Sequence, residues 1–313
     1  MLRVRALLSL AFGCLALLAL CVSRSEALPD TLKLVVPGVW FREGDLAGKG
    51  HCNNVIIEMK DYLIVVDANF PSGARAVMND VKRVSSKPVK YVFDTHHHGD
   101  HAYGNAVWTQ NGATTLAFKA VREEMGRYEP ARWQEAAKSR KDVGELNRDS
   151  VELPKQDINE DTYVLNDGKR KVEFRHFGWA HTRGDGFVYL PKEQLLCTGD
   201  AVVNGPYNYT GDGNVANWPN VVRSAAKLKV RYVLPGHGES GGREILTGQE
   251  QFMVELHNAV KTAVDQGKPA EGLEASLTLP ESVKHWVGDT LKSQVKDTYE
   301  EIKQGKPHGD LPH

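Results

Sequence analysis

The sequence predicts a mixed fold of helices and strands, with two β-sheets and with helices packed outside them. Three observations lead to this prediction. Short β-branched runs come in pairs with tight connections, as in hairpins; apolar residues elsewhere recur at helical spacing; and the two kinds of segment alternate along the chain. Periodicity alone leaves α/β and α+β architectures both open.

The composition is that of an ordinary globular protein. Of the 313 residues, 41% are hydrophobic and 25% are charged, which is sufficient for one large domain or two modest ones. Lys and Arg number 39 and Asp and Glu number 40, giving a formal net charge of −1. Because there is no basic excess, we expect no nucleic-acid partner.

The N-terminal segment has the pattern of an export signal. Two early arginines precede an apolar run over residues 6–22, and Ser25 and Ala27 are small residues where a signal peptidase reads the chain. We predict that residues 1–27 are a signal peptide and that the mature protein is periplasmic or secreted, without membrane attachment. An uncleaved anchor is the alternative, although the run is short for a membrane span.

Cleavage would leave two cysteines, Cys52 and Cys197. Two cysteines this far apart do not form a disulfide framework. They could pair in an oxidising compartment. We favour the simpler interpretation, in which both are small buried hydrophobic residues on strands.

The first half of the chain reads mainly as strands. Residues 51–58 and 62–66 are β-branched runs that predict a hairpin. Pro71 opens a helix that runs to about Ser85. Residues 89–93 form a short apolar run, typical of a buried strand, that leads directly into a histidine-rich segment.

The second half alternates in the same way. Residues 117–150 are rich in Lys, Arg and Glu and predict one or two surface helices, which either cap a cleft or decorate the surface. The portion from about 243 to 313 is predicted to be mainly helical. The remaining expected elements are strands at 172–177, 186–190, 194–197 and 232–234, and helices at 218–229, 243–266 and 281–304.

A cluster of potential metal ligands follows the strand at 89–93. His96, His98, Asp100 and His101 form the pattern H-x-H-x-D-H. Residues two apart in an extended loop project to the same side, so His96 and His98 can face one ion while Asp100 and His101 face a neighbouring one. Imidazole and carboxylate groups suit zinc.

Three further ligand types each follow a predicted strand. They are His181, Asp200 and His237. Functional side chains commonly lie where a strand of a rigid scaffold passes into a loop. Each residue alone would be unremarkable as a turn residue, but together with the first cluster they predict a site for more than one ion.

The succession VVDAN, THHHGDH, AHT, LLCTGD and LPGHG, over residues 64–238, resembles the five motifs of the metallo-β-lactamase superfamily. The resemblance implies an α+β (αββα) fold, two packed sheets with outer helices, over residues 28–313. It implies two Zn²⁺ ions, one held by His96, His98 and His181 and one held by Asp100, His101 and His237. It also implies that Asp200 bridges the ions and that Asp67 orients ligands from behind. His97 has no place in the pattern, so we expect it to be a spacer.

The chemistry implied is metal-assisted hydrolysis. A hydroxide held between two zinc ions is a strong nucleophile at neutral pH, and Asp100 is placed to orient it or to take its proton. The bond attacked would be an amide or ester-like bond of a small-molecule substrate. A β-lactam is the leading specific hypothesis.

Two alternatives stay open. The cysteine-containing β-lactamases of the family have Cys at the bridging position. An aspartate there, as at Asp200, instead resembles the pattern of glyoxalase II and of general hydrolases of the fold. A thioesterase or lactonase is therefore the second hypothesis. The third is a non-catalytic periplasmic metal-binding accessory protein, although the complete ligand set argues against it.

Polar and aromatic residues after Asp200 are candidates for substrate contact. They are Asn204, Tyr207 and Tyr209. Aromatic side chains beside a metal site often hold an apolar part of a substrate. We expect Trp218, by contrast, to serve packing, and the glycine-rich loop at 42–51 to form a flap.

Overall fold

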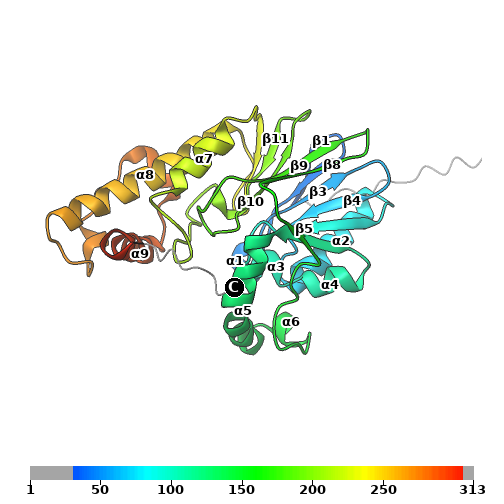
Figure 1. Ribbon diagram of the computed structural model, residues 1–313, viewed down its shortest axis with the longest axis horizontal. Coiled ribbons are helices and arrows are strands. Elements are labelled where there is room, and N and C mark those ends of the chain that lie inside the picture. The colour runs from blue at the N-terminus through cyan, green and yellow to red at the C-terminus, as the bar shows by residue number, and fades with distance from the viewer. Residues whose placement is uncertain (1–30, 306–313) are drawn as a thin grey trace, which may run out of the picture.

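Two β-sheets pack face to face, with helices on both outer sides (Figure 1). The computed structural model describes residues 31–305, so the signal-peptide prediction for residues 1–27 lies outside the described part. The α+β sandwich implied by the sequence motifs is confirmed. The seven-stranded sheet has the order β1(Leu32–Val36), β2(Val39–Arg42), β3(Asn54–Glu58), β4(Leu63–Val66), β5(Val89–Phe93), β6(Thr114–Phe118), β7(Gln156–Ile158).

The second sheet has five strands. Their order is β12(Tyr232–Leu234), β11(Leu195–Cys197), β10(Gly186–Leu190), β9(Lys171–His176), β8(Thr162–Asn166). Strands β4, β5 and β6 are parallel, as are β11 and β12. The carboxyl ends of these strands therefore meet at common edges, which is where the predicted ligands lie.

Alternation along the strands separates an inner core from outer ones. In β11, Leu195 and Cys197 join the core between the sheets, whereas Leu196 joins an outer core. In β3, Ile57 faces inward and Ile56 outward. This is the period of two expected of a strand that is buried on both faces, and it explains why these strands read as continuous apolar runs.

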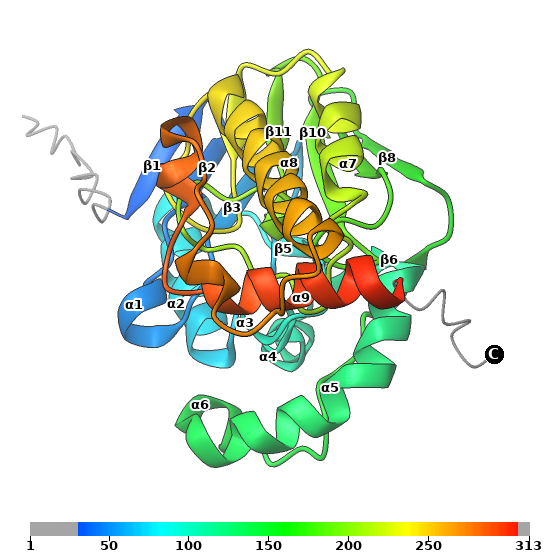
Figure 2. The same cartoon turned by 90° about the vertical axis from the view of Figure 1, so that its left-hand side faces the viewer.

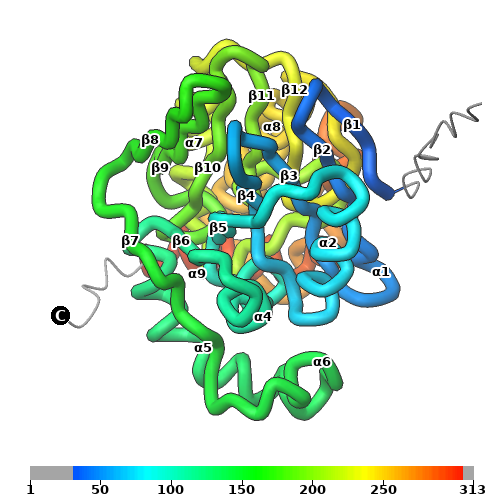
Figure 3. Tube along the Cα trace, turned by 90° about the vertical axis from the view of Figure 1, so that its right-hand side faces the viewer, coloured from blue at the N-terminus to red at the C-terminus, as the bar shows by residue number. Residues whose placement is uncertain are grey.

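The outer helices cover the two sheets separately. Helices α2(Pro71–Val84) and α4(Asn105–Gln110) pack on the seven-stranded sheet, and α7(Trp218–Ala226) and α8(Arg243–Asp265) pack on the five-stranded one. Helices α5(Lys119–Ser139) and α6(Lys141–Gly144) stand at one end of the molecule (Figure 3). Between residues 31 and 305, no helix has both the length and the apolar content needed to cross a bilayer.

The short elements escaped the sequence analysis. Helices α1(Leu46–Lys49) and α3(Gly99–Ala102) have four residues each, too few to show a helical period. The edge strands β7 and β8 were not predicted either, and no residue of β8 is fully buried, so no apolar run marks it. Cys52 and Cys197 are both free and buried, as expected of small hydrophobic residues, although Cys52 precedes strand β3.

The predicted single helix at 281–304 is wrong, because the structure divides it. A 3₁₀ helix, η3(Glu281–Trp286), is followed by a break and then by α9(Leu291–Gln304). Gly288 lies in the break, where a Cβ atom would come within 2.6 Å of the Pro206 side chain. The chain turns at this close approach, and α9 packs against α8 (Figure 2).

Two helical glycines have opposite surroundings, which gives a test of the packing. A Cβ at Gly248 of α8 would collide with the Trp286 indole, whereas one at Gly126 of α5 would meet nothing within 4 Å. We expect Gly248→Ala to lower the free energy of unfolding by about 1–3 kcal/mol through overpacking. Gly126→Ala should raise it by roughly 0.5–1 kcal/mol. Urea unfolding measures both; equal effects would contradict the packing of η3 on α8.

Candidate metal centre

All seven predicted ligands converge at one edge of the sandwich, and each follows a strand. His96 and His98 lie in the loop after β5, and Asp100 and His101 lie on α3 directly behind them. The other three come from the second sheet: His181 follows β9, Asp200 lies in η1(Gly199–Ala201) after β11, and His237 follows β12. His96 and His237, which are 141 positions apart in the sequence, thus lie in one cluster because the edges of the two sheets lie side by side.

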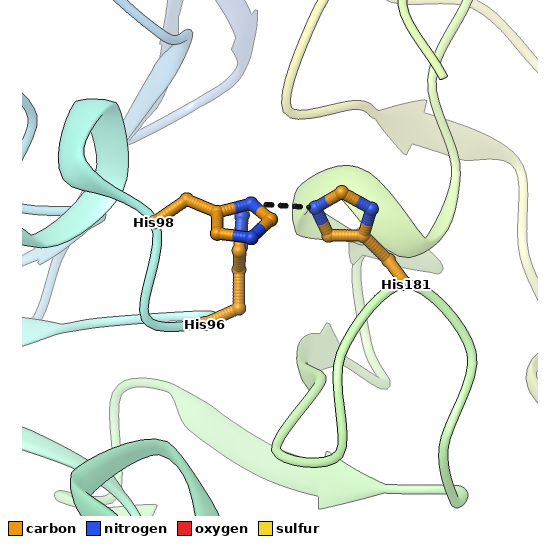
Figure 4. A group of neighbouring side chains, drawn as sticks. All are labelled: His96, His98 and His181. Carbon is orange, nitrogen blue, oxygen red and sulfur yellow. Dashed lines mark hydrogen bonds between the residues drawn. The ribbon is translucent and has the colours of Figure 1, made fainter. Parts of the chain in front are cut away.

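Three histidines form the first group. Ligand atoms of His96, His98 and His181 lie within 4.8 Å of one another. Figure 4 shows the rings of His98 and His181 facing each other, with His98 Nδ1 2.9 Å from His181 Nε2. Burial lowers the pKa of His96 well below its usual value and that of His181 to about 3, so both are neutral imidazoles.

The lone pairs of this group point at one another. His181 Nδ1 donates to the Tyr209 carbonyl at 3.0 Å, and His98 Nε2 donates to the Asp212 carboxylate at 2.8 Å. Burial also lowers the pKa of His98, so its imidazole is neutral as well, and in a neutral imidazole only one nitrogen carries hydrogen. The facing atoms, His98 Nδ1 and His181 Nε2, therefore both present lone pairs, an arrangement that a cation between them would stabilise.

A second group contains Asp100, His101 and His237. His237 Nε2 lies 3.1 Å from Asp100 Oδ2, and His101 Nε2 lies 3.4 Å from the same oxygen. Although burial opposes ionisation of the carboxyl group, the two imidazoles hold the pKa of Asp100 well below its usual range. Asp100 is therefore a carboxylate with negative charge directed at two ring nitrogens.

Asp200 lies between the two groups. Its Oδ1 is 3.3 Å from His101 Nε2, and its Oδ2 is 3.3 Å from His237 Nε2. The same Oδ2 lies 3.8 Å from His181 Nε2 and 3.9 Å from His96 Nε2. A side chain at position 236 would occupy the place of the Asp200 carboxylate, so the motif glycine there is required by space.

The donor set fits metal ions. Among the described residues, several buried polar atoms of this cluster have no hydrogen-bond partner: His96 Nε2, His101 Nε2 and Asp200 Oδ1. Buried polar groups normally have partners, and these atoms point toward one shared space. Nitrogen and carboxylate oxygen donors are the set that zinc accepts.

Asp67 occupies the position expected of a residue that orients ligands. Its Oδ2 lies 2.9 Å from His101 Nδ1, and its Oδ1 accepts from the backbone and hydroxyl of Thr95, each at 2.8 Å. Asp67 adopts a left-handed φ of 67°, which is uncommon for a residue with a side chain. The surrounding contacts therefore hold it in this conformation.

His97 is not a spacer, and this expectation is wrong. Its ring is fully buried, with Nδ1 2.9 Å from Glu129 and Nε2 3.3 Å from Glu124, both on α5. Burial opposes protonation, but the two carboxylates outweigh it and raise the pKa of His97 to about 9. His97 is thus a buried cation that attaches α5 to the ligand loop.

The sequence analysis also missed Asp212 and Arg132. Asp212 accepts from His98, and it accepts two hydrogen bonds from the Arg132 guanidinium at 2.8 and 3.0 Å. Arg132 in turn contacts Glu129. No local pattern could reveal this network, since its members lie up to 114 positions apart.

A cavity of about 390 Å³ opens over the cluster. Tyr207 and Tyr209, both predicted to contact substrate, line it and are 38% and 45% exposed. Asn204 does not line it; its side chain bonds instead to the Glu239 carbonyl and to His285. Trp218 is fully buried and serves packing, as expected. The cavity is also lined by Phe70, Tyr103, Asp100, Asp200, His237 and, from α5, by Glu129, Arg132 and Ala136.

Helix α5 therefore contributes a wall of this cavity, which supports the capping role for residues 117–150 rather than surface decoration.

Removal of His97 tests its buried ion pairs. His97→Ala would remove the buried cation that lies between Glu124 and Glu129, while Arg183 and Arg132 would still contact these carboxylates, so we expect it to lower the free energy of unfolding of the metal-free protein by about 3 kcal/mol, the lower end of the cost of breaking a buried ion pair. His257→Ala, on the outer helix α8, should change it by less than about 0.5 kcal/mol. Denaturant unfolding measures both. A His97→Ala protein as stable as the control would show that His97 is a spacer after all.

Comparison with known proteins identifies the family. A family model described as the metallo-beta-lactamase superfamily matches residues 47–237. The chain is 26% identical over 200 residues to a metallo-beta-lactamase type 2 of Bacillus cereus, covering 62% of this chain and 70% of that protein. A solved metallo-beta-lactamase from Pontibacter korlensis has a TM-score of 0.58 at 19% identity, covering 71% of this chain and 98% of that one. The metallo-beta-lactamase FIM-1 from Pseudomonas aeruginosa has a TM-score of 0.57 at 22% identity, covering 73% and 98%. With the family model spanning more than half of its length, this chain belongs to the metallo-beta-lactamase superfamily of hydrolases.

Proposed function

We propose that this protein is an exported, dinuclear zinc hydrolase that cleaves an amide or ester-like bond of a small molecule. The observation that carries the proposal is the pair of ligand groups joined by Asp200 beneath one open cavity. His96, His98 and His181 would hold one ion, and Asp100, His101 and His237 the other. Asp200 has two carboxylate oxygens and touches both groups, so it is suited to bridge them.

Bound zinc lowers the pKa of a water ligand to about 7 and polarises a substrate carbonyl oxygen. The protein's own residues orient the attacking water and the ligand rings. Asp100 is an ionised carboxylate that lines the cavity, so it would accept a hydrogen bond from the attacking water and orient it. Asp67 holds His101 from behind, which fixes the ring nitrogen that faces the cluster.

The cavity favours a substrate with an apolar part. Tyr207, Tyr209 and Phe70 line it beside the metal ligands, and aromatic walls of this kind hold apolar groups. Similarity to metallo-beta-lactamases of two Bacillus strains supports a β-lactam as the leading substrate. The cysteine-containing β-lactamases of the family have Cys at the position of Asp200. The aspartate in this chain therefore supports a thioester or a lactone as the second candidate substrate.

Export and partners are part of the same proposal. The basic and apolar pattern of residues 1–27 supports a periplasmic or secreted hydrolase, and the near-neutral net charge supports a small-molecule substrate rather than nucleic acid. A metal-binding accessory protein without turnover would not need the open cavity above the ligands. Complete ligand groups and an accessible cavity together favour an enzyme.

Zinc content and substrate choice test the proposal directly. Purified mature protein reconstituted with zinc should contain about two equivalents per chain, one for each group of ligands, and should hydrolyse nitrocefin faster than a thioester or a lactone. Metal analysis and a three-substrate rate comparison are the measurements. One equivalent or less would contradict the dinuclear centre. Faster thioester or lactone hydrolysis would replace the β-lactam by the second candidate, and no turnover would favour the accessory protein.

Substitution of Asp200 tests the bridge. Asp200→Ala removes an anion that offsets the repulsion between two nearby cations, so we expect loss of one zinc equivalent and a fall in turnover. Asp200→Cys should retain both ions, because thiolate is also a zinc ligand. Zinc titration and rates for the two variants decide the matter. Two zincs and normal turnover in Asp200→Ala would show that Asp200 does not bridge.

A further inference from the structure

The loop at residues 207–217 contacts the three-histidine group from outside, and we call it the tyrosine loop. Its Tyr209 carbonyl accepts from His181 Nδ1 at 3.0 Å, and its Asp212 carboxylate accepts from His98 Nε2 at 2.8 Å. These two contacts decide which nitrogen of each ring carries hydrogen and how the ring is turned. The position of the tyrosine loop therefore sets the direction of two of the three lone pairs.

The tyrosine loop has little regular structure of its own, so its position must be fixed by its neighbours. Helix α9 provides the first two anchors. Gln294 donates from Nε2 to the Asn208 carbonyl at 2.8 Å, and Asp297 accepts from the Thr210 hydroxyl at 2.6 Å. Asn208 and Gln294 are both buried, so the carbonyl would lack a partner without this helix.

Glu301 of the same helix provides the third anchor. Its two carboxylate oxygens accept from the backbone amides of Val215 and Ala216, at 3.0 and 2.9 Å. Gln294, Asp297 and Glu301 are spaced by three and four residues and so share one face of α9. One polar face thus holds the tyrosine loop from residue 208 to residue 216.

We propose that α9 is a positioning element of the metal centre, which holds the tyrosine loop and, through Tyr209 and Asp212, the orientation of His181 and His98. This inference rests on the proposed zinc function. Helix α9 lies beyond residue 237, where the match to the family model ends. The second ligand group has a different support, since His101 is held by Asp67 at the end of β4.

The two supports predict selective effects on zinc affinity. In a His237→Ala background, which leaves the three-histidine group, Glu301→Ala should weaken zinc binding by about 3–10-fold. This is less than the 10–100-fold found when the direct partner of a ligand is removed, because Glu301 holds the loop amides and Arg132 still holds Asp212. In a His98→Ala background, the same change should leave the affinity of the second group unaltered. Competition with a chromophoric chelator measures both. Glu301→Gln retains one acceptor oxygen and should lose less.

Glu300→Ala is the matched control. Glu300 is exposed on the same helix, and its contact with Lys296 at 3.8 Å is a surface ion pair of little value. We expect zinc affinity in this variant to equal that of the parent. Equal losses for Glu301→Ala and Glu300→Ala, or equal losses at the two ligand groups, would overturn the proposal.

Hydrogen exchange of the metal-free protein separates this proposal from the zinc function. The amides of Val215 and Ala216 should lose protection in Glu301→Ala and keep it in Glu300→Ala. If the wild-type protein binds no zinc, the proposed function fails. The exchange measurement still tests whether α9 holds the tyrosine loop. Unchanged protection of Val215 and Ala216 in Glu301→Ala would show that α9 does not hold it. Should Glu301→Ala not fold, Asp297→Ala and its exposed neighbour Lys296→Ala serve in the same measurements.

Discussion

The structure depends on the burial of polar groups whose lone pairs and negative charges face one shared space. His98 Nδ1 and His181 Nε2 approach within 2.9 Å, and Asp200 presents a buried oxygen that has no hydrogen-bond partner. Burying polar groups in this way costs free energy unless the groups find partners. It persists because each ring is held from its far side, His181 by a carbonyl, His98 by Asp212 and His101 by Asp67.

The sandwich provides the rigidity that this arrangement requires. Strands β4 and β5 are parallel, and so are β11 and β12, so the segments that follow them start from common edges. The carboxyl end of each of these strands is buried on both faces, with its last two side chains divided between an inner and an outer core. A ligand placed directly after such a strand has little freedom to move.

The sequence was sufficient for features that have a local pattern. The strand that precedes His96 and the helix that begins at Pro71 follow from periodicity, and the candidate ligands that the structure brings together follow from spacing and motif resemblance. The buried cation at His97 and the Asp212–Arg132 pair could not be predicted, because their partners lie 32 and 80 positions away and have no pattern in common. The break before α9 was missed for the same reason, since it depends on the contact of Gly288 with Pro206.

In the proposed enzyme, the tyrosine loop would link substrate recognition to the orientation of the metal ligands. Tyr207 and Tyr209 line the cavity, while the Tyr209 carbonyl and the Asp212 carboxylate hold two ligand rings. A change in the loop that reshapes the cavity therefore also moves the acceptors behind His181 and His98. Helix α5 has the same double role, because Arg132 lines the cavity and also binds Asp212. In the proposed enzyme, substrate preference and metal affinity would consequently be coupled through shared residues. Because α9 holds the tyrosine loop from outside the cavity, Tyr207 and Tyr209 can line the cavity while the contacts to His181 and His98 are kept.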